Sequence, residues 1–223
     1  MKKGLLKEAI VKLLSGVIIL GILLFIPAGT LKWRSGWILI SILFVPMFVA
    51  GIIMYFKAPD LLESRLRAKE TQNEQKHVIG FSVIMFLLVF IIAGLNYRFG
   101  WIILPDVVVY VGTAIFLLSY ALFGEVLREN RYLSRVIEVQ KDQKVVDSGL
   151  YGIVRHPMYF ATLFLFLSMP LVLNSLPSFI VMLSYIPIIV KRIRNEEEVL
   201  EKELTGYKEY KQKVRYRLVP FIY

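Results

Sequence analysis

The chain has 223 residues, of which 57% are hydrophobic, and its mean hydropathy is +0.63. Soluble domains are about 45–50% apolar, so this composition indicates an integral membrane protein. The lack of cysteine excludes disulfides, thiol catalysis and cysteine-ligated metals, and two histidines far apart in the sequence argue against a histidine metal site. We therefore expect no metal centre.

Six apolar segments are predicted to form helices: residues 9–26, 36–56, 78–95, 101–124, 158–173 and 177–190. A spanning helix needs about 20 mainly apolar residues, and the first four segments are long enough. The last two are short and are joined only by residues 174–176, so they are either two tilted spans or a tight hairpin that barely crosses. The predicted fold is an all-α, polytopic membrane protein with about six transmembrane helices and a cytoplasmic C-terminal helix and tail.

The positive charges predict the orientation. Six spans would place 24 of the 27 Lys and Arg residues on one side, and the other three are Lys32, Arg34 and Arg98. The positive-inside rule then makes both termini and the two long loops, 57–77 and 125–157, cytoplasmic. Topology and anionic lipid headgroups thus explain the net charge of +10, and nucleic acid is not needed as a partner.

Several shorter features complete the organisation of the chain. Trp33, Trp37 and Trp101 lie at span edges on the outer side, as in an aromatic belt. Residues 57–67 alternate leucines with charges and predict an amphipathic helix on the cytoplasmic face. Residues 191–203 lack a helix breaker and should continue the last span into the cytoplasm. The basic, aromatic tail 207–223 either folds back over the preceding loop or lies on lipid headgroups.

The polar stretch 147–159 is the first candidate site. It contains His156 followed by Pro157, and proline is tolerated in the first turn of a helix. Arg155 and His156 should therefore lie where a helix enters the membrane, which makes them functional-site candidates. The alternative is that Arg155 reaches a lipid phosphate while His156 is a surface loop residue.

The helix after residue 190 is the second candidate site. Arg192 and Glu196 are four residues apart and share a helix face. They could be part of a solvated face of weak ion pairs. However, three consecutive glutamates beside anionic lipid are unfavourable unless cations or a positive ligand lie nearby. Because the two blocks bracket a short hairpin, we expect them to meet in a pocket that suits a zwitterionic, aromatic ligand.

These residues resemble a known family. The run Ser-Gly-Leu-Tyr-Gly-Ile-Val-Arg-His-Pro-Met-Tyr at 148–159, the run Arg-Ile-Arg-Asn-Glu-Glu at 192–197 and the later Gly-Tyr-Lys-Glu-Tyr at 206–210 are similar to the isoprenylcysteine carboxyl methyltransferases, which belong with the membrane phospholipid methyltransferases. The resemblance covers about residues 140–223. It implies that residues 125–223 form a cofactor-binding catalytic region and residues 1–124 a four-span scaffold.

The resemblance also implies a cofactor, S-adenosyl-L-methionine, and a set of contacts. Carried over by position, the cofactor-binding residues would be Gln140, Gln143, Lys144, Val145, Val146, Tyr151, His156, Pro157, Met158, Tyr159 and Glu196. Glu196 would pair with the cofactor's ammonium group, and His156 and Tyr159 would donate to its carboxylate. Arg192 would face the substrate and hold an acceptor carboxylate; if the acceptor is an amine, Glu197 is a candidate base. Because a sulfonium methyl group is already activated, positioning is the main task.

We expect a methyltransferase that acts on a lipidic or membrane-embedded small acceptor, and two alternatives stay open. Residues 214–223 also resemble the end of the membrane sterol reductases, which use NADPH. Those enzymes carry Asn where this chain has Pro157, which favours the methyltransferase. The other alternative is a non-enzymatic membrane scaffold whose basic tail binds lipid or a partner. The sequence leaves the acceptor and the oligomeric state open.

Overall fold

A computed structural model describes residues 2–67, 73–130, 132–133 and 139–223 of the chain. Over these residues the secondary structure is helical, with no strand, which confirms the predicted all-α class. The elements are α1 (Lys2–Ala28), α2 (Arg34–Lys57), α3 (Pro59–Arg67), α4 (Asn73–Phe99), α5 (Asp106–Glu129), the 3-10 turn η1 (Gly149–Gly152), α6 (Pro157–Val172), α7 (Leu176–Met182), α8 (Tyr185–Glu203) and α9 (Tyr207–Lys213).

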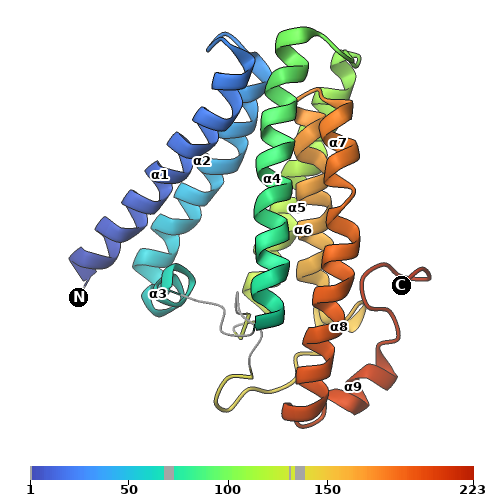
Figure 1. Cartoon of the computed structure of the whole chain (residues 1–223). Coiled ribbons are helices and arrows are strands. Elements are labelled where there is room, and N and C mark those ends of the chain that lie inside the picture. Colours follow the sequence, from blue (N-terminus) through green and yellow to red (C-terminus); the bar gives the residue numbers. More distant parts are fainter. Residues whose placement is uncertain (1, 68–72, 131, 134–138) are drawn as a thin grey trace.

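Helices α4 to α8 run side by side, while α1 and α2 lie beside each other and slant away from them toward the end that holds α3, α9 and both chain termini (Figure 1). Five described segments are long and apolar enough to cross a membrane: Gly4–Ala28, Arg34–Lys57, Val78–Phe99, Asp106–Glu129 and Leu176–Glu203. Helix α6 is a shorter apolar helix. The protein is an integral, multi-pass membrane protein, and each predicted apolar segment lies mainly within a helix.

The turn between α6 and α7 is the short connection that the sequence predicted between its last two apolar segments. Helix α6 has 16 residues, or about 24 Å at 1.5 Å per residue, which is shorter than a bilayer core of about 30 Å. Asn174 in the turn accepts a hydrogen bond from Leu104 N at 3.0 Å and donates to Leu104 O at 3.1 Å. The returning arm, α7 and α8, continues past the apolar residues 176–190 to Glu203, as the sequence predicted.

Helices α5 and α6 pack closely because Gly112 faces the end of α6. A Cβ at Gly112 would lie 2.7 Å from Leu171 Cβ, so a larger residue would push the helices apart. This contact matters for the site, since α6 begins at its edge. The buried side chains of the bundle include Leu24, Leu39, Phe116, Val172, Leu173, Met182 and Ile189.

Trp33 does not belong to an aromatic belt, so the prediction was wrong for this residue. Its side chain is only 2% exposed and stacks on Tyr97 with ring centroids 5.1 Å apart. Trp37 and Trp101 are about half exposed, as expected for a belt. Trp33 is buried because the turn between α1 and α2 packs against the end of α4, where Tyr97 lies.

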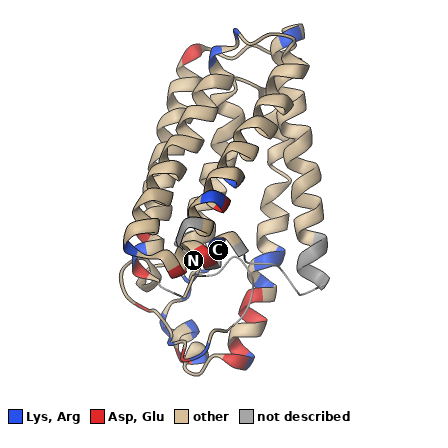
Figure 2. Cartoon of the chain, turned by 90° about the vertical axis from the view of Figure 1, so that its left-hand side faces the viewer, with Lys and Arg blue, Asp and Glu red and all other residues tan. Residues whose placement is uncertain are grey.

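Most charged residues lie at the end of the molecule that holds α3, the 139–156 loop and α9 (Figure 2). We call this the basic end. Between the two ends, exposed apolar side chains such as Ile53, Ile84 and Leu118 cover the helices, which suits contact with lipid.

Candidate active site

The loop before α6 is held by the end of α5. Gly149 has a φ of +50°, and a Cβ there would lie 1.3 Å from Glu129 Oε1. The Glu129 carboxylate accepts a hydrogen bond from Leu150 N at 3.0 Å. Asn130 Nδ2 donates to the Tyr151 hydroxyl at 3.0 Å. Glycine is therefore favoured at position 149, because a side chain there would strain the backbone and clash with Glu129.

The C-terminal segment 214–223, which we call the strap, folds back over this loop. Arg155 N donates to Tyr216 O, and His156 N donates to Arg217 O, each at 2.9 Å. The Arg155 guanidinium also donates to two strap carbonyls at 2.8 Å. Of the two positions that the sequence left open for the tail, the structure has the one over the loop, where buried main-chain groups satisfy one another.

A buried ionic cluster lies beneath the strap and centres on Glu197, which is 3% exposed. Arg155 Nε donates to Glu197 Oε1 at 2.7 Å, and Arg217 Nε donates to Oε2 at 2.9 Å. His156 Nε2 lies 3.2 Å from Oε1. Burial alone would raise the pKa of Glu197, but the hydrogen bonds from His156 and Arg155 outweigh it and hold the pKa at about 2. Glu197 is thus an ionised carboxylate that ties the loop, α8 and the strap together.

Glu196 points to a different side of α8, because successive residues of a helix are about 100° apart. Its carboxylate accepts a hydrogen bond from the Tyr159 hydroxyl. The same hydroxyl accepts a hydrogen bond from Arg192 Nε at 3.0 Å. His156 Nδ1 lies 3.9 Å from Glu196 Oε1. This group joins the first turn of α6 to α8 at the wall of a cleft.

The cleft opens to solvent at the basic end and contains a cavity of about 90 Å³. It brings together ten of the predicted site residues: Gln143, Lys144, Val145, Val146, Tyr151, His156, Met158, Tyr159, Arg192 and Glu196. Gln140, Pro157 and Glu197 are not part of its lining. Gln140 Nε2 instead donates to Tyr132 O at 2.9 Å. Pro157 is the first residue of α6.

Sequence reasoning missed seven further lining residues: Asn130, Tyr132, Leu133, Leu200, Leu204, Tyr207 and Tyr210. Tyr207 and Tyr210 are three residues apart on α9 and are both buried, and this spacing was a usable signal. Leu200 and Leu204 continue the cleft-facing side of α8 beyond Glu196. Asn130 and Tyr132 carry no comparable pattern, since only the packing of the loop brings them to the cleft.

Among the described residues, no group of three or more His, Asp or Glu side chains is arranged to hold a metal ion. The cleft instead combines one polar side, formed by His156, Arg192 and Glu196, with apolar and aromatic walls. Residues 107–202, from α5 through nearly all of α8, match the isoprenylcysteine carboxyl methyltransferase family. This match covers less than half of the chain.

The isoprenylcysteine carboxyl methyltransferase match includes the loop, α6 and the helix with Glu196, but ends before α9 and the strap. A solved structure of the eukaryotic intramembrane Ras methyltransferase ICMT superposes with a TM-score of 0.50 at 17% identity. This superposition covers 96% of this chain and 84% of that one. At such low identity, the likeness shows the fold alone.

A second relative comes from a different enzyme class. Mouse Delta(14)-sterol reductase TM7SF2 is 33% identical over 84 residues. That match covers 36% of this chain and only 20% of the reductase, so the chain spans about a fifth of this relative's length.

Proposed function

We propose that the protein is an S-adenosylmethionine-dependent methyltransferase of the membrane, acting on a lipidic or membrane-embedded small acceptor. One observation carries the proposal. Glu196, Tyr159 and Arg192 are in contact where the cleft reaches the first turn of an apolar helix. A carboxylate for the cofactor and a cation for the acceptor thus lie side by side, at the boundary between water and lipid.

The residues of the cleft fit this cofactor. Glu196 would hold its ammonium group, and His156 would hold its carboxylate. The Tyr159 hydroxyl already donates to Glu196 and accepts from Arg192, so we assign it the task of orienting both charges. Val145, Val146 and Tyr151 offer apolar and aromatic surface to the adenosine part. Lys144, Met158 and Gln143 would complete the walls, while Gln140 and Pro157 would shape the loop.

When bound, S-adenosylmethionine supplies a sulfonium methyl group, whose C–S bond breaks as the acceptor oxygen forms its bond to the methyl carbon and sulfur leaves as a neutral thioether. The protein's task is alignment. Arg192 would hold an acceptor carboxylate beside the cleft. We assign Glu197 a positioning role rather than that of a base, because its pKa of about 2 and its two arginine partners make it a poor proton acceptor at neutral pH. This favours a carboxylate acceptor over an amine.

We further propose that the basic end, with the cleft and both termini, is cytoplasmic. Support comes from the 24 Lys and Arg residues that the six-span topology assigns to that side. Residues 125–223 would then form the catalytic region and residues 1–124 a scaffold. The acceptor's lipid part would reach the cleft through the membrane, and anionic headgroups would surround the basic end.

The deciding experiment is calorimetric titration of the detergent-purified protein with S-adenosylmethionine, S-adenosylhomocysteine and NADPH. We expect saturable binding of the first two and a loss of binding in Glu196→Gln, with unchanged binding in the control Glu198→Gln, whose side chain is exposed. Binding of NADPH alone would support the reductase alternative instead. A protein that binds none of the three would support the scaffold alternative.

A further inference from the structure

Tyr207 is the first residue of α9 and has a buried ring. Its side chain is 4% exposed and packs in an apolar cluster with Leu204, Tyr210 and Val214. Val145 and Leu200 pack against the same cluster. The ring therefore docks α9 onto the end of α8 and onto the loop. Tyr207 also lines the cleft, beyond the end of the family match at residue 202.

The Tyr207 hydroxyl is buried and has no hydrogen-bond partner among the described residues. The other cleft tyrosines are satisfied. The Tyr210 hydroxyl donates to Tyr151 O at 2.7 Å, the Tyr132 hydroxyl donates to Asp142 O at 3.2 Å, and the Tyr151 hydroxyl accepts from an amide. A buried hydroxyl without a partner is costly, and such groups are rare in folded proteins. A polar ligand group in the cleft would supply the missing partner.

The charges around this hydroxyl indicate what kind of group would bind. Burial, and then the charges of Glu197 and Glu196, raise the pKa of the Tyr207 hydroxyl, and Arg155 opposes this only in part. The hydroxyl therefore stays protonated, and it can both donate and accept. Glu197 is already bonded to two arginines, so Glu196 is the carboxylate of the pair that lines the cleft.

We propose that the Tyr207 hydroxyl is a further cofactor contact and that it binds the α-amino-acid end of S-adenosylmethionine. This inference rests on the proposed function. The α-ammonium group offers N–H donors to both Glu196 and the hydroxyl oxygen. The adjacent α-carboxylate can accept the hydroxyl hydrogen. An α-amino acid presents both groups on a single carbon, which matches a hydroxyl that needs a donor, an acceptor or both.

The test uses Tyr207→Phe, which keeps the docking ring and removes only the hydroxyl. Two probes separate the parts of the ligand: S-adenosylhomocysteine carries the α-amino acid, while 5′-methylthioadenosine lacks it. We expect the dissociation constant for S-adenosylhomocysteine to rise about 10- to 100-fold, as for a lost hydrogen bond to a charged group. The constant for methylthioadenosine should not change.

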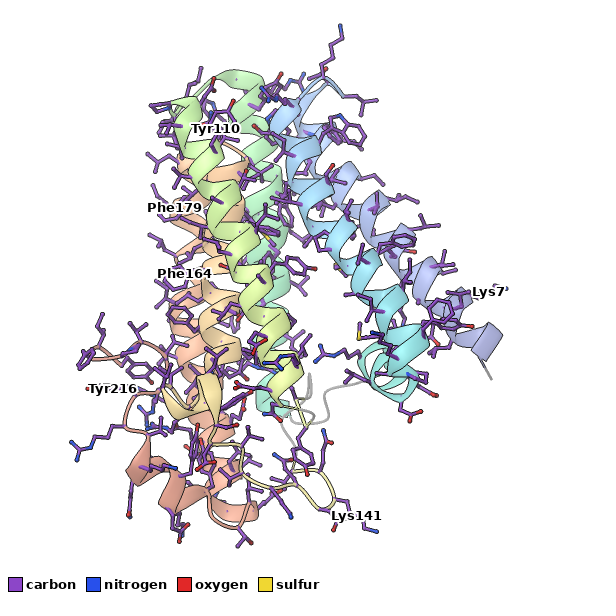
Figure 3. The ribbon with its side chains drawn as sticks, turned by 180° about the vertical axis from the view of Figure 1, so that it is seen from behind. Lys7, Tyr110, Lys141, Phe164, Phe179 and Tyr216 are labelled. Atoms are coloured by element: carbon purple, nitrogen blue, oxygen red, sulfur yellow. The ribbon has the colours of Figure 1, made fainter. Side chains whose placement is uncertain are left out.

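Tyr216→Phe is the matched control. Tyr216 belongs to the strap, does not line the cleft, and lies on the outer side of the molecule (Figure 3). Its hydroxyl should be dispensable for both probes. Without ligand, Tyr207→Phe should unfold at the same or a higher temperature, because it removes an unpaired buried hydroxyl. A lower unfolding temperature would mean that the hydroxyl has a protein partner, and would overturn the inference.

Two binding results would also overturn it. Unchanged affinity of Tyr207→Phe for S-adenosylhomocysteine would mean that the hydroxyl does not touch the ligand. Equal losses for both probes would place its contact on the adenosine part. A wild-type protein that binds neither probe would instead refute the proposed function itself, and the inference with it. The wild-type titration therefore separates the two failures.

Discussion

Three consecutive glutamates of α8 should behave in three different ways, and Glu197→Gln is the most informative change. Glu197 accepts from Arg155 Nε at 2.7 Å and from Arg217 Nε at 2.9 Å. A glutamine keeps the shape but turns an N–H₂ donor toward one of these arginine donors. It also leaves the Arg155 guanidinium, which is buried, without a counter-charge.

The expected loss of stability can be estimated in two ways. Breaking a buried ion pair by removing one partner costs about 3–5 kcal/mol. The fall in the pKa of Glu197 from 4.5 to about 2 corresponds to roughly 3 kcal/mol of favourable interaction with the ionised form. For a chain of this size, such a loss lowers the unfolding temperature by roughly 6–20 °C. Since the folded-state pKa is lowered, the contribution is present above pH about 4.5 and is lost as the pH falls toward 2.

The assay should report on the basic end. The three tryptophans lie in or beside the turns at the opposite end: Trp33, Trp37 and Trp101 (Figure 1). Their fluorescence therefore reports the unfolding of the membrane helices and not that of the basic end. The rate of trypsin cleavage after the Lys and Arg residues of α9 and the strap reports how well the Glu197 ion cluster holds these segments in place. We expect Glu197→Gln to be cut much faster than wild type at every pH from 5.5 to 8, and the exposed control Glu198→Gln to be cut at the wild-type rate. Equal rates for the two variants would refute the structural role of Glu197.

Further predictions concern the acceptor and the scaffold. Arg192→Ala should lower turnover about tenfold or more while leaving S-adenosylhomocysteine affinity nearly unchanged, since it removes one charged contact to the acceptor; equal losses would place Arg192 on the cofactor. Gly149→Ala should destabilise the site by about 1–3 kcal/mol because of its positive φ, measured by trypsin resistance. Gly112→Ala should lower the unfolding temperature by forcing α5 from α6, whereas Gly124→Ala, with open space around it, should not. Asn174→Ala should cost about 1–3 kcal/mol by leaving Leu104's main chain unpaired, read from tryptophan fluorescence.

Composition and local pattern determined much of this protein. Six apolar segments predicted the helices, because a membrane demands long apolar runs whose main-chain groups are paired internally. The polar stretch that ends at Pro157 predicted where α6 begins, because a proline in the first turn of a helix costs no helical hydrogen bond. These properties depend on residues near one another in the sequence. The motifs also predicted ten of the residues that line the cleft.

Only the tertiary structure decided the roles of neighbouring side chains. Glu196 lines the cleft, Glu197 is buried in an ion cluster and Glu198 is exposed, although the sequence presents three identical residues in a row. Tyr207 reaches the cleft because α9 docks on α8 and the loop. The strap covers the loop because main-chain groups about 60 residues apart in the sequence satisfy each other. The role of each of these side chains depends on which residues from distant parts of the sequence pack around it, and no local sequence pattern specifies those neighbours.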